Sequence, residues 1–174
     1  CWQEGASLDF QGQYFRHTLM TPMFNPGPNP FGPPPILLGA LGPLMTEVAG
    51  EVADGFLVHP VNSRRSLQEL TLPALAEGAA RAGRTLDGFE VVCVTIVVTG
   101  RDEREMTRSR EAVRRQLAFY GTTPAYQPVF ALHGLGDLRP ELTRMARADR
   151  WDDMADLIPD DLLEAIAVCG SPDE

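Results

Sequence analysis

Cysteine and long apolar runs are scarce in this sequence, and each scarcity excludes a class of protein. The three cysteines, Cys1, Cys93 and Cys169, are odd in number and far apart, which argues against a disulfide framework and a zinc site. We expect them to be reduced thiols of a cytoplasmic protein. The apolar runs fall far short of the ~18 residues that a membrane helix needs. No membrane span is therefore predicted, and the first residues lack the charged and apolar regions of a signal peptide.

Basic residues are also scarce relative to acidic ones. The chain has 15 Lys+Arg against 24 Asp+Glu, which gives a formal charge of −9 and a pI near 4.8. Its arginines are spread along predicted helices and form no basic tract. Such a charge balance opposes binding to nucleic acid, and we expect no nucleic-acid partner. The 44% of hydrophobic residues are nevertheless enough to bury a core, which excludes a disordered chain.

Several catalytic and metal-binding motifs are missing. There is no G-x-S-x-G, no P-loop, no G-x-G-x-x-G and no H-E-x-x-H. The acidic residues between Asp149 and Asp161 lack the spacing and the central glycine of an EF-hand, so we expect them to be solvated or to cap helices. No metal ion is therefore predicted.

The first part of the chain, residues 8–35, predicts little regular structure. Residues 8–20 alternate apolar and polar side chains around a glycine, which favours a short extended pair or an edge strand. Residues 22–35 are rich in proline, which fixes φ and removes a backbone donor, so they predict a stiff, irregular loop. Its apolar residues suggest that this loop packs on something: Met23, Phe24 and Phe31.

Residues 36–120 predict three units of a strand followed by a helix. The strands are the apolar runs 36–40, 56–59 and 89–98. The first helix starts at Gly42-Pro43, the second has a capping box at Ser66–Glu69 and a break or fresh start at Pro73, and the third runs from Asp102 to about Tyr120. Residues 121–174 are predicted to be helical in three segments: Pro124–Leu132, Leu138–Ala148 and Asp161–Val168.

Strands that alternate with helices through short loops predict an α/β fold with parallel strands. Three such units cannot close an eight-stranded barrel, which needs about 250 residues. The chain is therefore either a small open sheet or part of a TIM barrel. Both ends read as cut from a longer protein, and this favours a single fragment, residues 1–174, of a barrel.

Ligands of parallel α/β folds bind outside the carboxyl ends of the strands. The first such loop contains Gly39 and Gly42 directly before a helix start, an arrangement that suits a phosphate group but more often only makes a tight turn. The next loop carries His59, Asn62, Arg64 and Arg65. An arginine there could pair with a phosphate, or be solvated at a helix start, while His59 could face a pocket or be packed. His17 and His133 are not expected to be catalytic.

The segment PPPILLGALGPLMTEVAGEVADGFLVHP, residues 33–60, resembles the bacterial luciferase-like monooxygenase superfamily, whose members are TIM barrels. DFQGQYFRHTLM and LPALAEGAARAGR are similar to further segments of that family. AFYGTTPAYQPVFALHG and IPDDLLEAIAVCGSPDE resemble a subgroup of oxidoreductases that depend on coenzyme F-420, a deazaflavin. The resemblance extends from about Asp9 to Glu174.

The resemblance implies that the chain is the C-terminal half of a partial (β/α)8 barrel, with its three strands as the sixth, seventh and eighth. It also implies hydride transfer between coenzyme F-420 and a small organic substrate. By position, the turn that receives the cofactor phosphate is Gly39, Ala40, Leu41, Gly42 and Pro43. The family often has a basic phosphate ligand after the next strand, where this chain has Asn62, with Arg64 two residues on and His59 nearby.

The catalytic residues are then expected in the missing N-terminal half, with His59 as a possible one, and the fragment itself is expected to be inactive. Two alternatives stay open: a luciferase-like monooxygenase dependent on flavin mononucleotide (FMN) and oxygen, and a non-catalytic α/β fragment. A partial barrel also exposes sheet edges, from which we expect a homo-oligomer.

Overall fold

The computed structural model describes residues 1–173 and divides into two compact units, Cys1–Ile36 and Leu37–Glu174. In the first unit, β1 (Phe10–Gln11) pairs antiparallel with β2 (Arg16–His17). This confirms the extended pair. A single 3-10 turn, η1 (Pro22–Phe24), interrupts the proline-rich loop. The packing expected of that loop is wrong for the described structure, because its three large apolar side chains are exposed: Met23, Phe24 and Phe31.

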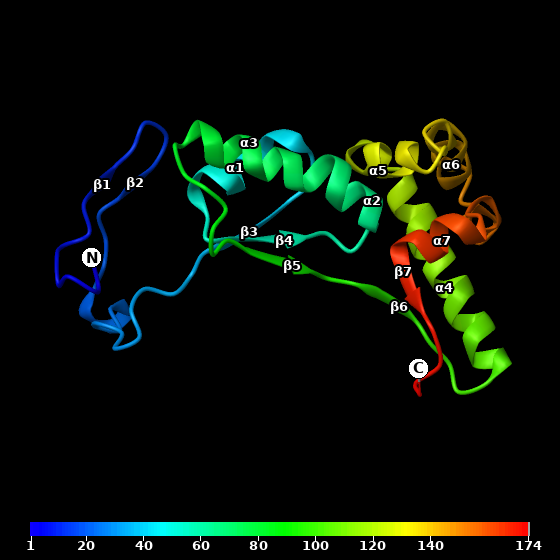
Figure 1. Ribbon diagram of the computed structural model, residues 1–174, viewed down its shortest axis with the longest axis horizontal. Coiled ribbons are helices and arrows are strands. Elements are labelled where there is room, and N and C mark those ends of the chain that lie inside the picture. Colours follow the sequence, from blue (N-terminus) through cyan, green and yellow to red (C-terminus); the bar gives the residue numbers. More distant parts are fainter. Residues whose placement is uncertain (174) are drawn as a thin grey trace. The chain divides into compact units, whose positions relative to one another are not determined.

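The second unit contains a parallel sheet in the order β3 (Leu37–Ala40), β4 (Gly55–Val58) and β5 (Glu90–Cys93). In this register Ala40 lies beside Val58, and Val58 lies beside Cys93. The carboxyl ends of the three strands therefore meet at one edge of the sheet, where β3 and β4 each lead through a short loop into a helix (Figure 1). This confirms an α/β fold with parallel strands.

The third predicted strand is bent. We predicted one strand over 89–98, but the structure has β5 followed by β6 (Ile96–Val98). β5 pairs with β4, whereas β6 pairs with a different strand, β7 (Ala167–Cys169). The apolar run cannot stay straight because each half follows a different neighbour, and strands twist relative to one another.

Strand β7 also corrects the end of the chain. The helix predicted over Asp161–Val168 is α7 (Asp160–Ile166), and residues Ala167–Cys169 are extended alongside β6. Only pairing with a distant strand decides this, so local spacing could not reveal it. The parallel strands therefore occupy four positions rather than three: β3, β4, the bent strand β5–β6, and β7. The assignment of 89–98 as the last of these strands is wrong. Glu174, the end of the resemblance, lies outside the described residues.

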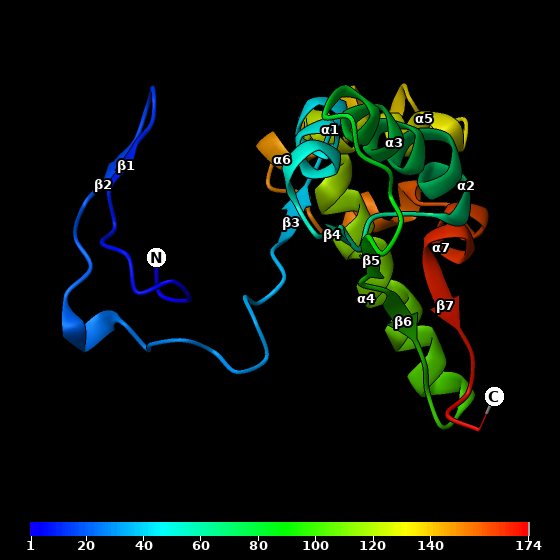
Figure 2. The same ribbon diagram turned by 60° about the vertical axis from the view of Figure 1, so that its left-hand side comes forward.

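Helices α1 (Pro43–Val52) and α3 (Leu72–Arg81) lie side by side over one face of the β3–β4–β5 sheet (Figures 1 and 2). One glycine on each helix allows the two helix backbones to approach closely. An added Cβ on Gly50 would lie 3.0 Å from the backbone nitrogen of Ala79, and one on Gly78 would lie 2.6 Å from the carbonyl carbon of Glu47. Under the helices is a small apolar core: Ala49, Ala53, Phe56, Val58 and Leu75.

The second helix starts earlier than predicted. The capping box is formed by Ser63 and Ser66, not by Ser66–Glu69, and α2 (Arg64–Ser66) begins directly after Ser63. A five-residue π-helical turn, η2 (Leu67–Thr71), then joins α2 to α3, with the Leu72 N–H donating to the Leu67 carbonyl. Proline at position 73 has no N–H to donate, so the α-helical ladder is interrupted here. The break predicted at Pro73 is thus a π-turn.

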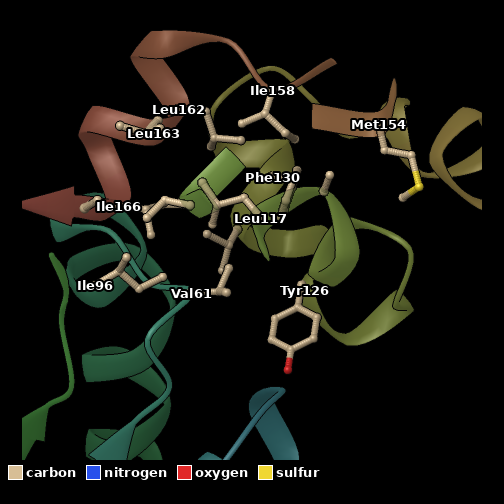
Figure 3. Close-up of a cluster of buried hydrophobic side chains, with 14 of the residues drawn as sticks. Val61, Ile96, Leu117, Tyr126, Phe130, Met154, Ile158, Leu162, Leu163 and Ile166 are labelled. Carbon is tan, nitrogen blue, oxygen red and sulfur yellow. The ribbon is translucent and has the colours of Figure 1, made fainter. Parts of the chain in front are cut away.

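A second, larger core lies between the β6–β7 pair and the remaining helices (Figure 3). The helices are α4 (Glu103–Gly121), η3 (Pro124–Tyr126), α5 (Gln127–Leu132), α6 (Leu138–Arg147), η4 (Asp153–Leu157) and α7. The helix start predicted at Asp102 is present, since the Asp102 carboxylate accepts a hydrogen bond from the Glu105 N–H and so caps α4. Acidic residues of the 149–161 region form surface ion pairs, such as Asp153 with Arg150. Among residues 1–173, no helix meets the length and hydropathy that a bilayer crossing requires.

Candidate functional site

A cavity of about 450 Å³ lies at the carboxyl ends of β3 and β4, within the second unit. Its walls come from the turn after β3, from α1, from the loop after β4, from η2 and the start of α3, and from residues 125–129. Six of the eight residues predicted for the site line it: Ala40, Leu41, Gly42, Pro43, His59 and Asn62. Gly39 and Arg64 do not. Gly39 lies within β3 beside Leu57, and Arg64 is exposed at the start of α2.

The turn after β3 leaves the start of α1 open. Gly42 has φ 84° and ψ 156°, a conformation that is essentially restricted to glycine, and a Cβ there would meet nothing within 4 Å. Its carbonyl accepts hydrogen bonds from the N–H and the Oγ1 of Thr46, at 3.3 Å and 2.9 Å. No side chain caps the helix. The turn therefore presents free backbone amides and the positive end of a ten-residue helix to open space.

His59, directly after β4, has both ring nitrogens engaged. Nδ1 accepts from the Val61 N–H at 3.1 Å, so the neutral ring carries its proton on Nε2, which lies 3.2 Å from the Tyr126 Oη. The ring also contacts Tyr120 and Tyr126, with centroids 5.2 Å and 4.9 Å away. Burial lowers the pKa of His59. This geometry favours a histidine that positions the loop over one that exchanges protons with a ligand.

Tyr126 was not singled out by sequence reasoning. It is buried, and its hydroxyl points away from the apolar cluster around Phe130 and Leu117 (Figure 3). Burial, and then the neighbouring Tyr120, raise the pKa of Tyr126. No local motif marks a tyrosine in this role, because its partner His59 lies 67 positions away in the chain.

The remainder of the second loop is held by hydrogen bonds. The Asn62 Oδ1 accepts from the Ser66 Oγ at 2.8 Å, and the Ser63 Oγ lies 2.9 Å from the His133 Nε2. Burial, followed by the charge of Arg65, lowers the pKa of His133. Arg65 itself bonds Glu69 at 2.8 Å and the carbonyl oxygen of Leu132. Among the described residues, then, Arg64 is the cation of this loop without a partner of its own.

The lowered pKa values of His59 and His133 predict the sign of a pH dependence in the stability of the fold. Their pKa values are lowered in the folded state, so the unfolded chain binds more protons as the pH falls through the ordinary value of 6.5. We expect the melting temperature to drop between pH 7.5 and the lowered pKa values, and to drop less in His59→Gln. Thermal unfolding at several pH values measures this. An equal drop in both proteins would show that His59 does not contribute.

Residues 1–173 contain no group of three or more His, Cys, Asp or Glu side chains that could hold a metal ion. The polar side chains around the cavity are instead Thr46, Glu47, His59, Asn62, Ser66, Glu69, Thr71 and Glu77. A group that binds here would meet backbone amides, neutral polar side chains, three carboxylates and apolar walls.

Comparisons with known proteins agree on one family. Residues 1–174 match the family described as "Luciferase-like monooxygenase". An uncharacterized protein of Mycobacterium tuberculosis is 48% identical over 172 residues, which are 99% of this chain and 51% of the relative. The 5,10-methylenetetrahydromethanopterin reductase of Methanopyrus kandleri is 31% identical over 173 residues, 98% of this chain and 47% of the relative.

A solved structure gives the same result for the fold. The coenzyme F-420 dependent tetrahydromethanopterin reductase from M. kandleri superposes with a TM-score of 0.72 at 26% identity, covering 99% of this chain and 48% of that one. The predicted partial TIM barrel is thereby confirmed. The chain spans about half the length of the curated relatives it matches.

Proposed function

Because the chain belongs to the luciferase-like monooxygenase family, we propose that it forms part of an oxidoreductase that transfers a hydride between coenzyme F-420 and an organic substrate. The observation that carries the proposal is the glycine turn before α1, in a chain similar to a reductase described as dependent on coenzyme F-420. That coenzyme carries a phosphate group, and an uncapped helix start is a common place to hold one.

The residues of the turn fit such a group. The space beside Gly42 is open, and the first-turn amides of Leu44 and Met45 belong to residues that are themselves exposed. Thr46 bonds the Gly42 carbonyl twice, which holds the turn in this shape. When bound, the coenzyme supplies the hydride chemistry, and the protein supplies binding and orientation.

The second loop has supporting roles in this proposal. His59 fixes the loop through Val61 and Tyr126. Asn62 borders the cavity and is oriented by Ser66. Arg64, exposed at the start of α2, adds a positive charge to the approach of an anionic group.

We expect no turnover from the 174 residues alone, because barrel enzymes draw their catalytic residues from the ends of several strands. Binding is therefore the appropriate measurement. The purified chain is titrated with coenzyme F-420 and, separately, with FMN, and the fluorescence of each cofactor is followed. We expect coenzyme F-420 to bind more tightly. Tighter binding of FMN would favour a flavin-dependent monooxygenase, and binding of neither would favour a non-catalytic fragment.

A further inference from the structure

We propose that His133, directly after α5, is a positioning residue that acts through Ser63 and Ser66 to aim the side-chain amide of Asn62 at a phosphate oxygen in the cavity. The inference rests on the proposed function only for the identity of the ligand. It is drawn from a chain of hydrogen bonds that joins the end of α5 to the cavity, and from the donors and acceptors that this chain contains.

Four side chains form a continuous path from the end of α5 to the cavity. The His133 Nε2 lies 2.9 Å from the Ser63 Oγ, which lies 3.3 Å from the Ser66 Oγ. The Ser66 Oγ in turn lies 2.8 Å from the Asn62 Oδ1. Ser63 and Ser66 are buried, with 4% and 1% of each residue exposed, while Asn62 lines the cavity. Since buried hydroxyls have no bulk water as a partner, their protons and lone pairs must be matched within this path.

The backbone fixes the direction in which protons are donated along the path. The Ser63 Oγ accepts from the Ser66 N–H at 3.1 Å, and the Ser66 Oγ accepts from the Ser63 N–H at 2.8 Å. A hydroxyl has two lone pairs and one proton, so each serine accepts one further hydrogen bond and donates one. If the His133 Nε2–H donates to Ser63, then Ser63 donates to Ser66, and both hydroxyls have filled their lone pairs.

This arrangement decides how the Asn62 amide is turned. The Ser66 proton has two acceptors in reach, the Asn62 Oδ1 at 2.8 Å and the Ser63 carbonyl oxygen at 3.0 Å, and the Asn62 Oδ1 is the closer. Because the Ser66 Oγ has no lone pair left, the Asn62 amide cannot donate to it. Asn62 therefore turns its oxygen toward Ser66 and its two N–H groups, for which the described residues supply no acceptor, toward the cavity.

An acceptor in place of the His133 Nε2–H would reverse this order. Ser63 would donate to residue 133, and one lone pair of the Ser66 Oγ would become free. The Asn62 amide would then turn an N–H toward Ser66 and present its oxygen to the cavity. A donor at position 133 thus determines whether a ligand meets the N–H groups or the oxygen of Asn62.

The cavity has need of such a donor if it holds a phosphate group. Among the described residues no arginine lines it, and His59 and Thr46 direct their protons to Tyr126 and to the Gly42 carbonyl. The carboxylates in its wall are paired with arginines: Glu47 and Glu77 with Arg81, and Glu69 with Arg65. A hydrogen bond from the amide of Asn62 to a charged oxygen is stronger than one between neutral groups. Asn62 therefore adds to the backbone amides that follow Gly42.

Three variants test the proposal by titration with coenzyme F-420. His133→Gln keeps an N–H₂ group at the same number of bonds from the backbone as the imidazole Nε2, whereas His133→Glu places an acceptor there. We expect Asn62→Ala to bind about tenfold less tightly and His133→Glu to approach the same loss. His133→Gln should stay within about twofold of the wild type, because the donor is restored. Circular dichroism checks that each variant folds.

The Asn62→Ala background controls for the charge that His133→Glu adds. If His133 acts through Asn62, the His133→Glu change has no further effect in this background, because the group that it positions is gone. Repulsion by the new carboxylate, or altered packing of α5, would weaken binding equally with and without Asn62. That result, or a loss in His133→Gln as large as in His133→Glu, would overturn the proposal.

Nitrogen NMR of the ligand-free wild-type chain tests the path without the coenzyme and without a variant at His133. We expect the His133 ring to carry its proton on Nε2 at neutral pH, since that atom must donate to Ser63. We also expect the signals of the Asn62 side-chain amide to shift when inorganic phosphate is added. A neutral ring with its proton on Nδ1, or amide signals that do not respond to phosphate, would contradict the proposed arrangement.

The two proposals fail separately. If the His133 tautomer and the response of Asn62 to inorganic phosphate are as expected but coenzyme F-420 does not bind, the proposed function is wrong and the role of His133 stands. If coenzyme F-420 binds but His133→Glu weakens it equally with and without Asn62, the reverse holds.

Discussion

Gly78→Ala is expected to destabilise the chain by about 2–4 kcal/mol, the range of severe overpacking in a core. The new Cβ would overlap the Glu47 carbonyl where α1 crosses α3, and its contact atoms are backbone, which cannot rotate away. The helix preference of alanine over glycine offsets only about 1 kcal/mol of that cost. Urea unfolding followed by circular dichroism measures the difference in the free energy of unfolding.

Gly39→Ala is the matched control. Its Cβ would lie 3.7 Å from the Leu57 Cβ, an ordinary contact, and Gly39 has no unusual φ. A loss in this variant as large as that in Gly78→Ala would show that added volume between α1 and α3 is not the cause. A stable Gly78→Ala protein would mean that the two helices can separate without cost.

Gly42→Val is expected to weaken the binding of coenzyme F-420 by roughly ten- to a hundredfold, or about 1–3 kcal/mol. The protein itself leaves space for the new side chain, but φ 84° is strained for valine, so the turn must change and re-aim the amides of α1. Titration by cofactor fluorescence, with the melting temperature recorded alongside, separates affinity from folding. Wild-type affinity in a folded Gly42→Val protein would rule out this turn as the phosphate site.

Gly83→Val provides the control for backbone strain. Gly83 ends α3 with φ 68°, also has nothing within 4 Å of an added Cβ, and does not line the cavity. It should lower the melting temperature while leaving the affinity unchanged. Arg64→Ala tests the side-chain charge separately, and any effect it has on affinity should shrink as salt is added.

The parts of the fold that the sequence predicted correctly are those that depend on patterns of neighbouring residues. The apolar runs at 36–40 and 56–59, each followed by a helix start, are strands β3 and β4 within one residue. The extended pair around Gly12 and the helix start at Asp102 are confirmed for the same reason. In each case the residues that decide the structure are close in sequence.

The elements that the sequence did not predict depend on contacts between residues that are far apart in the chain. Ala167–Cys169 is a strand only because Ile96–Val98 lies beside it. The bend in 89–98 likewise follows from two different neighbours. At Pro73 the break was predicted, but the π-turn that absorbs it was not, because it depends on the packing of both flanking helices.

The candidate site shows the same division. Gly-rich spacing located the turn at 39–43, yet only the structure separates Gly42, which opens the helix start, from Gly39, which lies in the strand. The contact of His59 with Tyr126, 67 positions away in the chain, could not be read from the loop sequence alone. The proposed roles of these residues stay predictions until binding is measured.

The strand pairs on the two sides of the bent strand differ in the length of chain that lies between their paired residues. The β3–β4 pair joins residues 37 and 55, whereas the β6–β7 pair joins residues 96 and 167. Closing the longer loop costs more conformational entropy, and contacts between distant residues slow folding. The β3–β4–β5 sheet can therefore assemble from nearby sequence, while β6 must wait until β7 has been synthesised.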